Sequence, residues 1–281
     1  GISAGYHLDH SNFDVDLYES KNSWGGLLDN FSIDGGFTFD TFIHLSFTKS
    51  TYVKNLFDKS SESIVHNPIS YNLSNGKWIK HPVQFNLSPL GFFEKLKIII
   101  GFITRNNSIE VNNYKDWLYK NYGKYFSDNY PIKYTKKYWT VDPENLTTNW
   151  LGSRFNVPKL SQIIKGSIFK TTENFYYANE MRYPKTGGYK SYLNFMANNL
   201  SINLNKKAIK IDFKQKYIYF EDGKTQSYDK IISTLPLPEL LKLLIEVPKN
   251  VMIASQKLLA TSGQLVSIAF NKEIDQQIEI N

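Results

Sequence analysis

The chain contains no cysteine. This absence excludes disulfide bonds, thiolate metal sites, iron–sulfur clusters and cysteine nucleophiles, and it is compatible with a reducing, cytoplasmic setting, which we expect for this protein. Histidine is scarce as well. Only His7 and His10 lie close together in the sequence, and two ligands do not make a metal site. There is no serine elbow or His–Asp pairing of the kind found in hydrolases. The protein therefore has little reactive machinery of its own, as expected for an enzyme whose cofactor carries the chemistry.

The sequence also lacks a long apolar run. Its most apolar segment, residues 87–103, contains three charged residues and is too short for a comfortable membrane span. Four apolar residues recur in it at helical spacing, namely Leu90, Phe93, Leu96 and Ile100. This spacing predicts an amphipathic helix that turns these residues toward a core. The alternative is an interfacial helix that lies on a membrane, because the flanks are basic; stable membrane insertion is not expected.

Acidic residues are outnumbered, and the net charge is +7 with a pI near 9.1. The lysines are spread along the chain rather than gathered into runs, and no nucleic-acid-binding motif is visible, so we do not expect a nucleic-acid partner. A solvated basic surface explains the charge most simply. The more specific alternative is that part of this charge lines a cleft that binds an anionic small molecule such as a sugar diphosphate.

The segment from Asp14 to Asp40 organises the rest of the chain. A short apolar-leaning run, residues 13–18, predicts a buried strand, and Glu19 closes it. A carboxylate at the end of such a strand can accept hydrogen bonds from both ribose hydroxyls of an adenosine. The pair Gly25-Gly26 follows, where backbone can approach a ligand without an intervening Cβ.

Residues 1–8 predict a helix that precedes this strand. In the dinucleotide-binding fingerprint G-x-G-x-x-G, the third glycine allows close packing of the helix, and an acid follows roughly 20 residues later. Gly1 and Glu19 fit this spacing if Gly1 is the third glycine. The first strand and two earlier glycines would then lie upstream of residue 1. An ordinary helix–strand pair is the simpler interpretation of these two residues alone.

Several later motifs appear in a consistent order. Gly35-Gly36-Phe37-Thr38-Phe39-Asp40 and His44 are followed by Tyr134-Thr135-Lys136-Lys137-Tyr138-Trp139, Asp142-Pro143-Glu144-Asn145-Leu146, Arg182-Tyr183-Pro184-Lys185-Thr186-Gly187-Gly188-Tyr189 and Ile232-Ser233-Thr234-Leu235-Pro236. Together with Glu19 and Gly25-Gly26-Leu27, this set resembles the FAD-dependent superfamily of flavin amine oxidases, protoporphyrinogen oxidases and phytoene desaturases. The later segments are similar to the branch that contains the UDP-galactopyranose mutases.

The resemblance implies an α/β fold with a Rossmann-like FAD-binding domain, its first strand missing here, and an inserted α+β substrate domain. We expect residues 1–50 and 186–240 to form the FAD-binding domain, and residues 51–185 and 241–281 to form the substrate-binding domain. Within these, the pattern predicts hairpins at residues 69–79 and 217–223, a helix over residues 114–125, a helix over residues 189–200, strands over residues 202–213 and 228–234, and a final strand over residues 264–270.

The resemblance also assigns roles to individual residues. FAD would be bound by Gly1, Glu19, Gly25, Gly26, Leu27, Gly187, Gly188, Ile209 and Ser233. His44, Arg182 and Lys185 would act at the reaction centre, and Tyr134, Lys136, Trp139, Arg154 and Tyr189 would line the substrate side. Simpler roles stay open: a turn-capping histidine, a surface ion pair beside a tight turn, core aromatics, and plain β-scaffold at Ile209 and Ser233.

Two enzymatic functions are compatible with this set. The first is an FAD-dependent oxidoreductase that acts on a small anionic or sugar-nucleotide substrate, with flavin N5 as the reactive centre. The second is an isomerase similar to UDP-galactopyranose mutase, which uses reduced FAD without net redox change. His44 follows Phe42-Ile43, whereas relatives often carry a glycine before this histidine, so the mutase pattern is incomplete. A binding module without catalysis is a third possibility.

Overall fold

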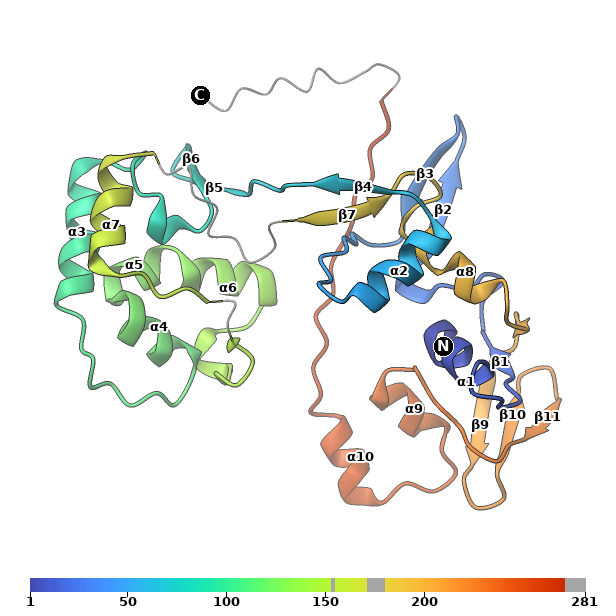
Figure 1. Cartoon of the computed structure of the whole chain (residues 1–281). Helices are drawn as coiled ribbons and strands as arrows, with labels where there is room; N and C mark the ends of the chain where they lie inside the picture. Colours follow the sequence, from blue (N-terminus) through green and yellow to red (C-terminus); the bar gives the residue numbers. More distant parts are fainter. Residues whose placement is uncertain (153–154, 171–179, 271–281) are drawn as a thin grey trace. The chain divides into compact units, whose positions relative to one another are not determined.

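The computed structural model describes residues 1–152, 155–170 and 180–270. They form two compact units of mixed α/β structure (Figure 1). The described residues of the first unit lie within Gly1–His66 and Met181–Glu273, and those of the second within Asn67–Glu180. These boundaries differ from the expected domain limits at residues 50, 185 and 240, because strand β4 before the second unit pairs with strand β7 after it. Which part binds the cofactor stays a prediction.

The described part of the first unit combines short helices with four small sheets. Its helices are α1 (Ile2–Asp9), α2 (Thr51–Ser60), α8 (Asn194–Ala197), α9 (Leu237–Leu243) and α10 (Lys249–Ser255), with the 3₁₀ turns η1 (Gly26–Leu28) and η5 (Tyr189–Leu193). Its strands are β1 (Leu17–Tyr18), β2 (Asn30–Ile33), β3 (Phe37–Asp40), β4 (Ser63–His66), β7 (Met181–Pro184), β8 (Ile202–Asn203), β9 (Ala208–Asp212), β10 (Tyr217–Phe220) and β11 (Thr225–Ser227).

Strand pairing in the first unit joins distant parts of the sequence. β1 runs parallel to β8, with Leu17 opposite Ile202, and helix α1 lies against β1. β2 and β3 form an antiparallel hairpin, β4 pairs antiparallel with β7, and β9, β10 and β11 form an antiparallel sheet. Two small cores support these strands: one between α1, α2 and α8, and one under the β9–β10 sheet.

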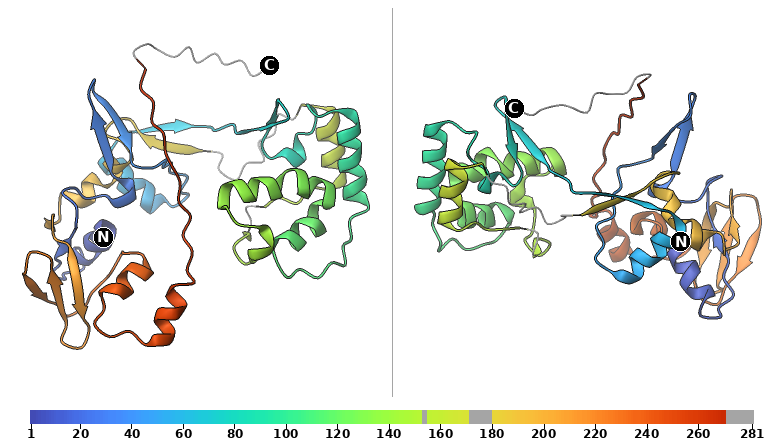
Figure 2. Two further views of the ribbon diagram at one scale, coloured as in Figure 1. Left: turned by 180° about the vertical axis from the view of Figure 1, so that it is seen from behind. Right: turned by 45° about the horizontal axis from the view of Figure 1, so that its top comes forward.

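The second unit is mostly helical. It contains the hairpin β5 (Tyr71–Ser74) and β6 (Lys77–Lys80), the 3₁₀ turns η2 (Val83–Phe85) and η3 (Pro143–Asn145), and the helices α3 (Phe92–Ile103), α4 (Tyr114–Tyr122), α5 (Lys124–Asn129), α6 (Pro131–Trp139) and α7 (Leu160–Ile168). One continuous core joins them, with Ile79, Leu87 and Leu118 fully buried at its centre. Figure 2 shows this helical unit from two further directions.

The predicted hairpins are confirmed. Asn75 and Gly76 both have positive φ, 50° and 74°, as a two-residue hairpin turn requires, and they connect β5 to β6. Asp222-Gly223 turns β10 into β11, with Gly223 at φ 80°. In both turns, glycine adopts a backbone conformation that other residues rarely accept, so the local sequence alone specifies them.

The predicted buried face of the helix over residues 87–103 is wrong for three of its four residues; only Leu90, which precedes the helix, is buried. Helix α3 begins at Phe92, and the residues it buries are Ile98 and Phe102. Phe93 is 75% exposed, and Leu96 and Ile100 are also exposed. The helix carries apolar residues on nearly all sides, so its periodicity fits more than one face. Packing against the other helices of the unit decides which face is buried.

Three other predicted elements differ in extent, and two predicted strands do not form. The run over residues 13–18 forms only the two-residue strand β1, and Phe13 is exposed. The helix over residues 114–125 ends at Tyr122, because Gly123 has φ 80°. The helix over residues 189–200 is divided into η5 and α8. Residues 228–234 and 264–270 form no strand, because no other described segment pairs with either one.

Among the described residues, no helix is both long enough and apolar enough to cross a membrane.

The two sides of α3 should respond differently to truncation. We expect Ile98→Ala to lower the free energy of unfolding by about 2–5 kcal/mol, because it opens a cavity in the core. Phe93→Ala should change it by less than about 0.5 kcal/mol, because the ring is exposed. Chemical denaturation followed by tryptophan fluorescence measures both, since Trp117 packs against the same core. Equal losses in the two variants would contradict this assignment of faces.

Candidate functional site

Glu19 follows β1 directly and is tied to the neighbouring strand. Its backbone N–H donates to the Asn203 carbonyl at 2.9 Å, and its own carbonyl accepts from the Lys206 N–H at 2.8 Å. One carboxylate oxygen, Oε1, accepts from the Lys21 N–H at 2.9 Å and from Ser20 Oγ at 3.2 Å. Among the described residues Oε2 has no partner, so it is available to a ligand.

Gly1 lies beside this carboxylate. The Glu19 carboxylate is close enough to the Gly1 nitrogen to interact with it electrostatically. A Cβ on Gly1 would lie 3.8 Å from the Leu17 side chain and 3.9 Å from Thr234 Oγ1. The end of β1, the start of α1 and the turn after Ser233 therefore meet in one place. The Ser233 hydroxyl itself accepts from the Leu235 N–H at 3.3 Å.

The first glycine pair precedes η1 and leaves its backbone open. Gly25 and Gly26 have φ of 129° and 61°, values that favour glycine. A Cβ on Gly25 would lie 3.1 Å from the backbone of Asp29, whereas one on Gly26 would meet nothing within 4 Å. Leu27 is 71% exposed. Gly25 is thus required for folding of the turn, while Gly26 presents unobstructed backbone.

A largely buried ion pair lies just after this turn. Lys190 Nζ is 2.7 Å from Asp29 Oδ1, and it also lies 4.4 Å from the centre of the Trp24 ring. Burial by itself would raise the pKa of Asp29. Hydrogen bonds from Lys190, Ser23 and the Asn30 N–H, together with the charge of Lys190, outweigh burial and lower that pKa. Neither residue of this pair is marked by a motif in the sequence.

Asp40, at the end of β3, connects this region to the second glycine pair. Its Oδ2 accepts from the Tyr183 hydroxyl at 2.7 Å, and its Oδ1 accepts from the Tyr189 N–H at 2.9 Å. Asn30 Nδ2 donates to the Gly187 carbonyl at 2.7 Å. Burial and the hydrogen bond to Asp40 raise the pKa of Tyr183, so its hydroxyl stays protonated and continues to donate. The hairpin β2–β3 thus holds the turn before η5.

Gly188 fits this contact closely. Its φ is 69°, and a Cβ would lie 2.6 Å from Asp40 Oδ1 and 2.7 Å from Asn30 Nδ2. Gly187, at φ 80°, has more room, since a Cβ there would first meet Ser191 at 3.3 Å. Both glycines adopt left-handed backbone, but only Gly188 is also restricted by polar groups that hold the turn.

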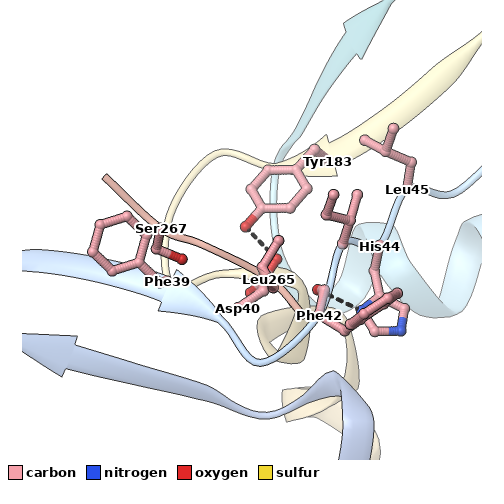
Figure 3. A pocket seen from close by; sticks show the side chains of 9 residues that line it. Phe39, Asp40, Phe42, His44, Leu45, Tyr183, Leu265 and Ser267 are labelled. Carbon is pink, nitrogen blue, oxygen red and sulfur yellow. Dashed lines mark hydrogen bonds between the residues drawn. The ribbon is translucent and has the colours of Figure 1, made fainter. Parts of the chain in front are cut away.

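A pocket of about 300 Å³ opens beside Asp40. Figure 3 shows His44, Tyr183 and Asp40 along its wall, with apolar side chains around them. His44 Nδ1 lies 2.9 Å from the Phe42 carbonyl, and the His44 ring lies 5.3 Å from the ring of Tyr189. A carbonyl can only accept, so Nδ1 carries the proton, and Nε2 is the acceptor when the ring is neutral.

Arg182 and Lys185 lie in different surroundings. Arg182 sits in β7, only partly exposed, with Nη1 4.0 Å from Asp58 Oδ1. Its backbone exchanges hydrogen bonds with Ser46 at 2.7 and 2.9 Å. Lys185 Nζ is 2.9 Å from Glu62 Oε2 in a largely exposed ion pair. Lys185 therefore forms the surface ion pair that was its simpler expected role. Arg182, in contrast, is held by strand β4 on one side and by the backbone of Ser46 on the other.

The remaining expected site residues fall into three groups. Ile209 is half-exposed in β9. Tyr134 and Trp139 lie in α6 of the second unit, where Tyr134 stacks on Tyr138 at 5.5 Å and Trp139 lies 6.1 Å from Trp150. Lys136, in the same helix, pairs with Asp142. Arg154 lies outside the described residues. Within the described ranges no group of three metal-ligating side chains occurs.

The fit at Gly188 leads to a prediction with a matched control. Gly188→Ala should lower the free energy of unfolding by about 1–3 kcal/mol more than Gly36→Ala, because both strain the backbone but only the first displaces a hydrogen-bonded carboxylate. Gly36 has φ 80° and open space where a Cβ would lie. Thermal and urea unfolding measure the difference, and equal destabilisation would contradict the close fit.

The Asp29–Lys190 pair should show in the pH dependence of stability. Lys190→Met removes the cation and keeps the apolar stem, so we expect a loss of roughly 1–3 kcal/mol at neutral pH. The folded-state pKa of Asp29 is lowered. The stabilisation that the Asp29 carboxylate contributes is therefore fully present above the pKa of Asp29 in the unfolded chain, about 4. It is lost as the pH falls through the lower pKa of Asp29 in the folded protein. The difference between wild type and variant, measured by urea unfolding, should shrink under acid; a constant difference would contradict the assignment.

Two family models match this chain. Residues 1–60 match the NAD(P)-binding Rossmann-like domain, and residues 140–270 match the flavin containing amine oxidoreductase family. The first match covers the helix–strand segment with Gly1 and Glu19, and the second covers the second glycine pair and the turn at Ser233.

Solved structures share the fold. A crystal structure of reduced UDP-galactopyranose mutase superposes with a TM-score of 0.84 at 24% identity, over 92% of this chain and 59% of that one. A protoporphyrinogen oxidase-like protein from Exiguobacterium gives 0.64 at 14% identity, over 90% and 60%. Putrescine oxidase bound to putrescine gives 0.60 at 13% identity, over 91% and 60%. The chain thus spans about three fifths of the length of these relatives.

The family matches and the shared fold agree with the order of motifs read from the sequence. The chain thus resembles the superfamily of flavin amine oxidases and protoporphyrinogen oxidase-like proteins in two matching segments and in its fold.

Proposed function

We propose that the protein is an FAD-dependent oxidoreductase that acts on a small anionic or sugar-nucleotide substrate. The main support is the way the first unit gathers its glycine turns. Asp29, Asn30 and Asp40 hold the turn at Gly187-Gly188 next to the turn at Gly25-Gly26, although these turns are far apart in the sequence. Such an arrangement of open backbone beside a pocket suits a large, flat, phosphorylated cofactor.

The residues present fit FAD. Gly26 offers backbone with open space where a Cβ would lie, and Gly188 is packed so closely that no larger residue fits. Glu19 Oε2 would accept from the ribose hydroxyls, with Gly1, Gly25 and Leu27 close to the phosphates and Ile209 and Ser233 on the adenine side. When bound, FAD supplies a hydride acceptor, or in its reduced form a nucleophilic nitrogen, at N5.

The chain's own residues would position the substrate and control charge. Arg182 would bind a phosphate or carboxylate group, because its guanidinium is permanently charged. Its backbone is held by β4 and Ser46, which supports this role. His44 would present Nε2 to the pocket, where in the neutral ring it can accept a hydrogen bond from a substrate. Lys185 is a weaker candidate because its ammonium already pairs with Glu62.

The second unit offers an aromatic surface for a base or sugar. Tyr134 and Tyr138 present stacked rings, and Trp139 and Trp150 continue the cluster. Aromatic rings of this kind stack on nucleobases and on the apolar faces of sugars. Lys136, in the same helix, and Arg154, which lies outside the described residues, would add positive charge for a diphosphate. In the first unit, Tyr189 would contribute to substrate binding next to His44.

A second candidate function is isomerisation of a nucleotide sugar with reduced FAD. The TM-score of 0.84 to UDP-galactopyranose mutase, against 0.64 and 0.60 for the other two relatives described above, favours it, as does the aromatic cluster on α6. A test with the intact protein separates the two functions. UDP-galactose isomerisation that requires prior reduction of the flavin selects the isomerase, whereas substrate-dependent flavin reduction under anaerobic conditions selects the oxidoreductase. Absence of bound flavin would contradict both.

We also propose that the protein acts in the cytoplasm, which the lack of cysteine supports.

The role of Glu19 can be tested apart from turnover. We expect Glu19→Ala to weaken FAD binding by about 1–3 kcal/mol, or roughly 5- to 150-fold in Kd, because the ribose hydroxyls lose their acceptor. Flavin fluorescence during titration of the apoprotein measures this. Glu221→Ala is the matched control: it also removes a carboxylate from the first unit, in a pair with Lys207. Equal affinities for both variants would refute the assignment.

A further inference from the structure

Helix α3 of the second unit exposes a continuous apolar stripe. Five of its side chains are exposed: Phe92, Phe93, Leu96, Ile100 and Ile103. At about 100° of turn per residue they fall within one side of the helix, opposite the buried Ile98 and Phe102. The exposed side is therefore as apolar as the buried one. At its beginning two adjacent phenylalanines are 73% and 75% exposed.

Helix α7 carries a second stripe of the same kind. Leu160, Ile164 and Ile168 recur every four residues and are exposed, and Phe169 follows them. The opposite side of α7 is buried through Ile163, Gly166 and Ser167. Both helices thus bury one face in the core and expose apolar side chains on another.

The two helices that carry these stripes pack against each other and against the rest of the unit. α3 packs against α5 at Gly101, where a Cβ on Gly123 would meet the Gly101 carbonyl, and α7 packs against η2 at Gly166. α3 and α7 also contact each other, as both views in Figure 2 show. We call the nine exposed apolar residues of α3 and α7, including Phe169, the α3–α7 face.

Positive charge surrounds this face. Lys95 and Lys97 lie in α3, Lys165 lies in α7, and Lys159 and Lys170 flank α7. The one acidic residue in these two helices, Glu94, accepts from the Tyr130 hydroxyl at 2.7 Å, so a neighbouring group already satisfies it. Apolar side chains bordered by lysines are the chemistry of a surface that rests on anionic lipid.

We propose that the α3–α7 face docks on the surface of an anionic phospholipid bilayer. The phenylalanines, leucines and isoleucines enter the boundary between headgroups and acyl chains, and the lysines contact the phosphates and carboxylates of the headgroups. Neither helix is long enough to cross, so the unit lies on the bilayer rather than through it. A symmetric pairing of two copies through the same face would bring these lysines opposite one another, which opposes self-association.

Vesicle co-sedimentation of the intact protein tests the proposal. We expect binding to vesicles that contain phosphatidylserine, weak binding to phosphatidylcholine alone, and a decrease in bound fraction with rising salt. Phe92→Glu/Phe93→Glu should lower the affinity about tenfold or more, because it removes the apolar contact and adds repulsion. Leu258→Glu/Leu259→Glu, an exposed apolar pair in the first unit, should leave binding much closer to wild type.

The contribution of the lysines to vesicle binding is tested with a separate control. Lys95→Glu/Lys97→Glu should reduce binding to phosphatidylserine vesicles far more than Lys77→Glu/Lys224→Glu, which makes the same change in net charge away from the face. Circular dichroism confirms that each variant is folded. Equal binding to neutral and anionic vesicles, equal effects of the two lysine pairs, or no vesicle binding would each overturn the proposal. So would self-association, detected by light scattering, that replaces vesicle binding and is abolished by the phenylalanine variant.

Discussion

The arrangement of the first unit depends on the carboxylate of Asp40. One of its oxygens accepts from the Tyr183 side chain and the other from the Tyr189 backbone, across sequence separations of 143 and 149 residues. Hydrogen bonds to a charged acceptor contribute about 1.5–3 kcal/mol each, more than most surface ion pairs. The Arg182–Asp58 pair, at 4.0 Å, is correspondingly the weaker link. The turn at Gly188 therefore takes its position from a hairpin formed much earlier in the chain.

Local signals predicted the parts of the fold that local chemistry determines. The turn at Asn75-Gly76 and the helix α1 follow from residue types within a few positions of each other. The exposed face of α3 could not be predicted, because almost every side of that helix is apolar and only the neighbouring helices decide between them. Likewise, the segment 228–234 alternates as a strand does, but a strand also requires a partner, and partners are set by tertiary structure.

The candidate site was predictable to a similar degree. The order of motifs pointed to Glu19 and to both glycine pairs, because glycine and acid at fixed spacing have few other uses. Lys190 gave no such signal: lysine is rarely buried, and nothing in the sequence indicates that this one reaches Asp29. Asp40 belongs to a motif, but the sequence indicates no role for it. In the structure it joins the hairpin β2–β3 to the turn at Gly187-Gly188. A partner far away in the sequence is visible only once the chain is folded.

The pairing of β4 with β7 has a consequence for how the chain was assembled. His66 and Met181 face each other in register at the point where the chain leaves the first unit and returns to it. Topologically, the whole second unit is thus the loop of one β-hairpin. Entry and exit points that adjoin in this way let a domain be inserted, exchanged or removed while the host sheet keeps its hydrogen bonds. Recombination at this hairpin would let the first unit carry a series of interchangeable attachments.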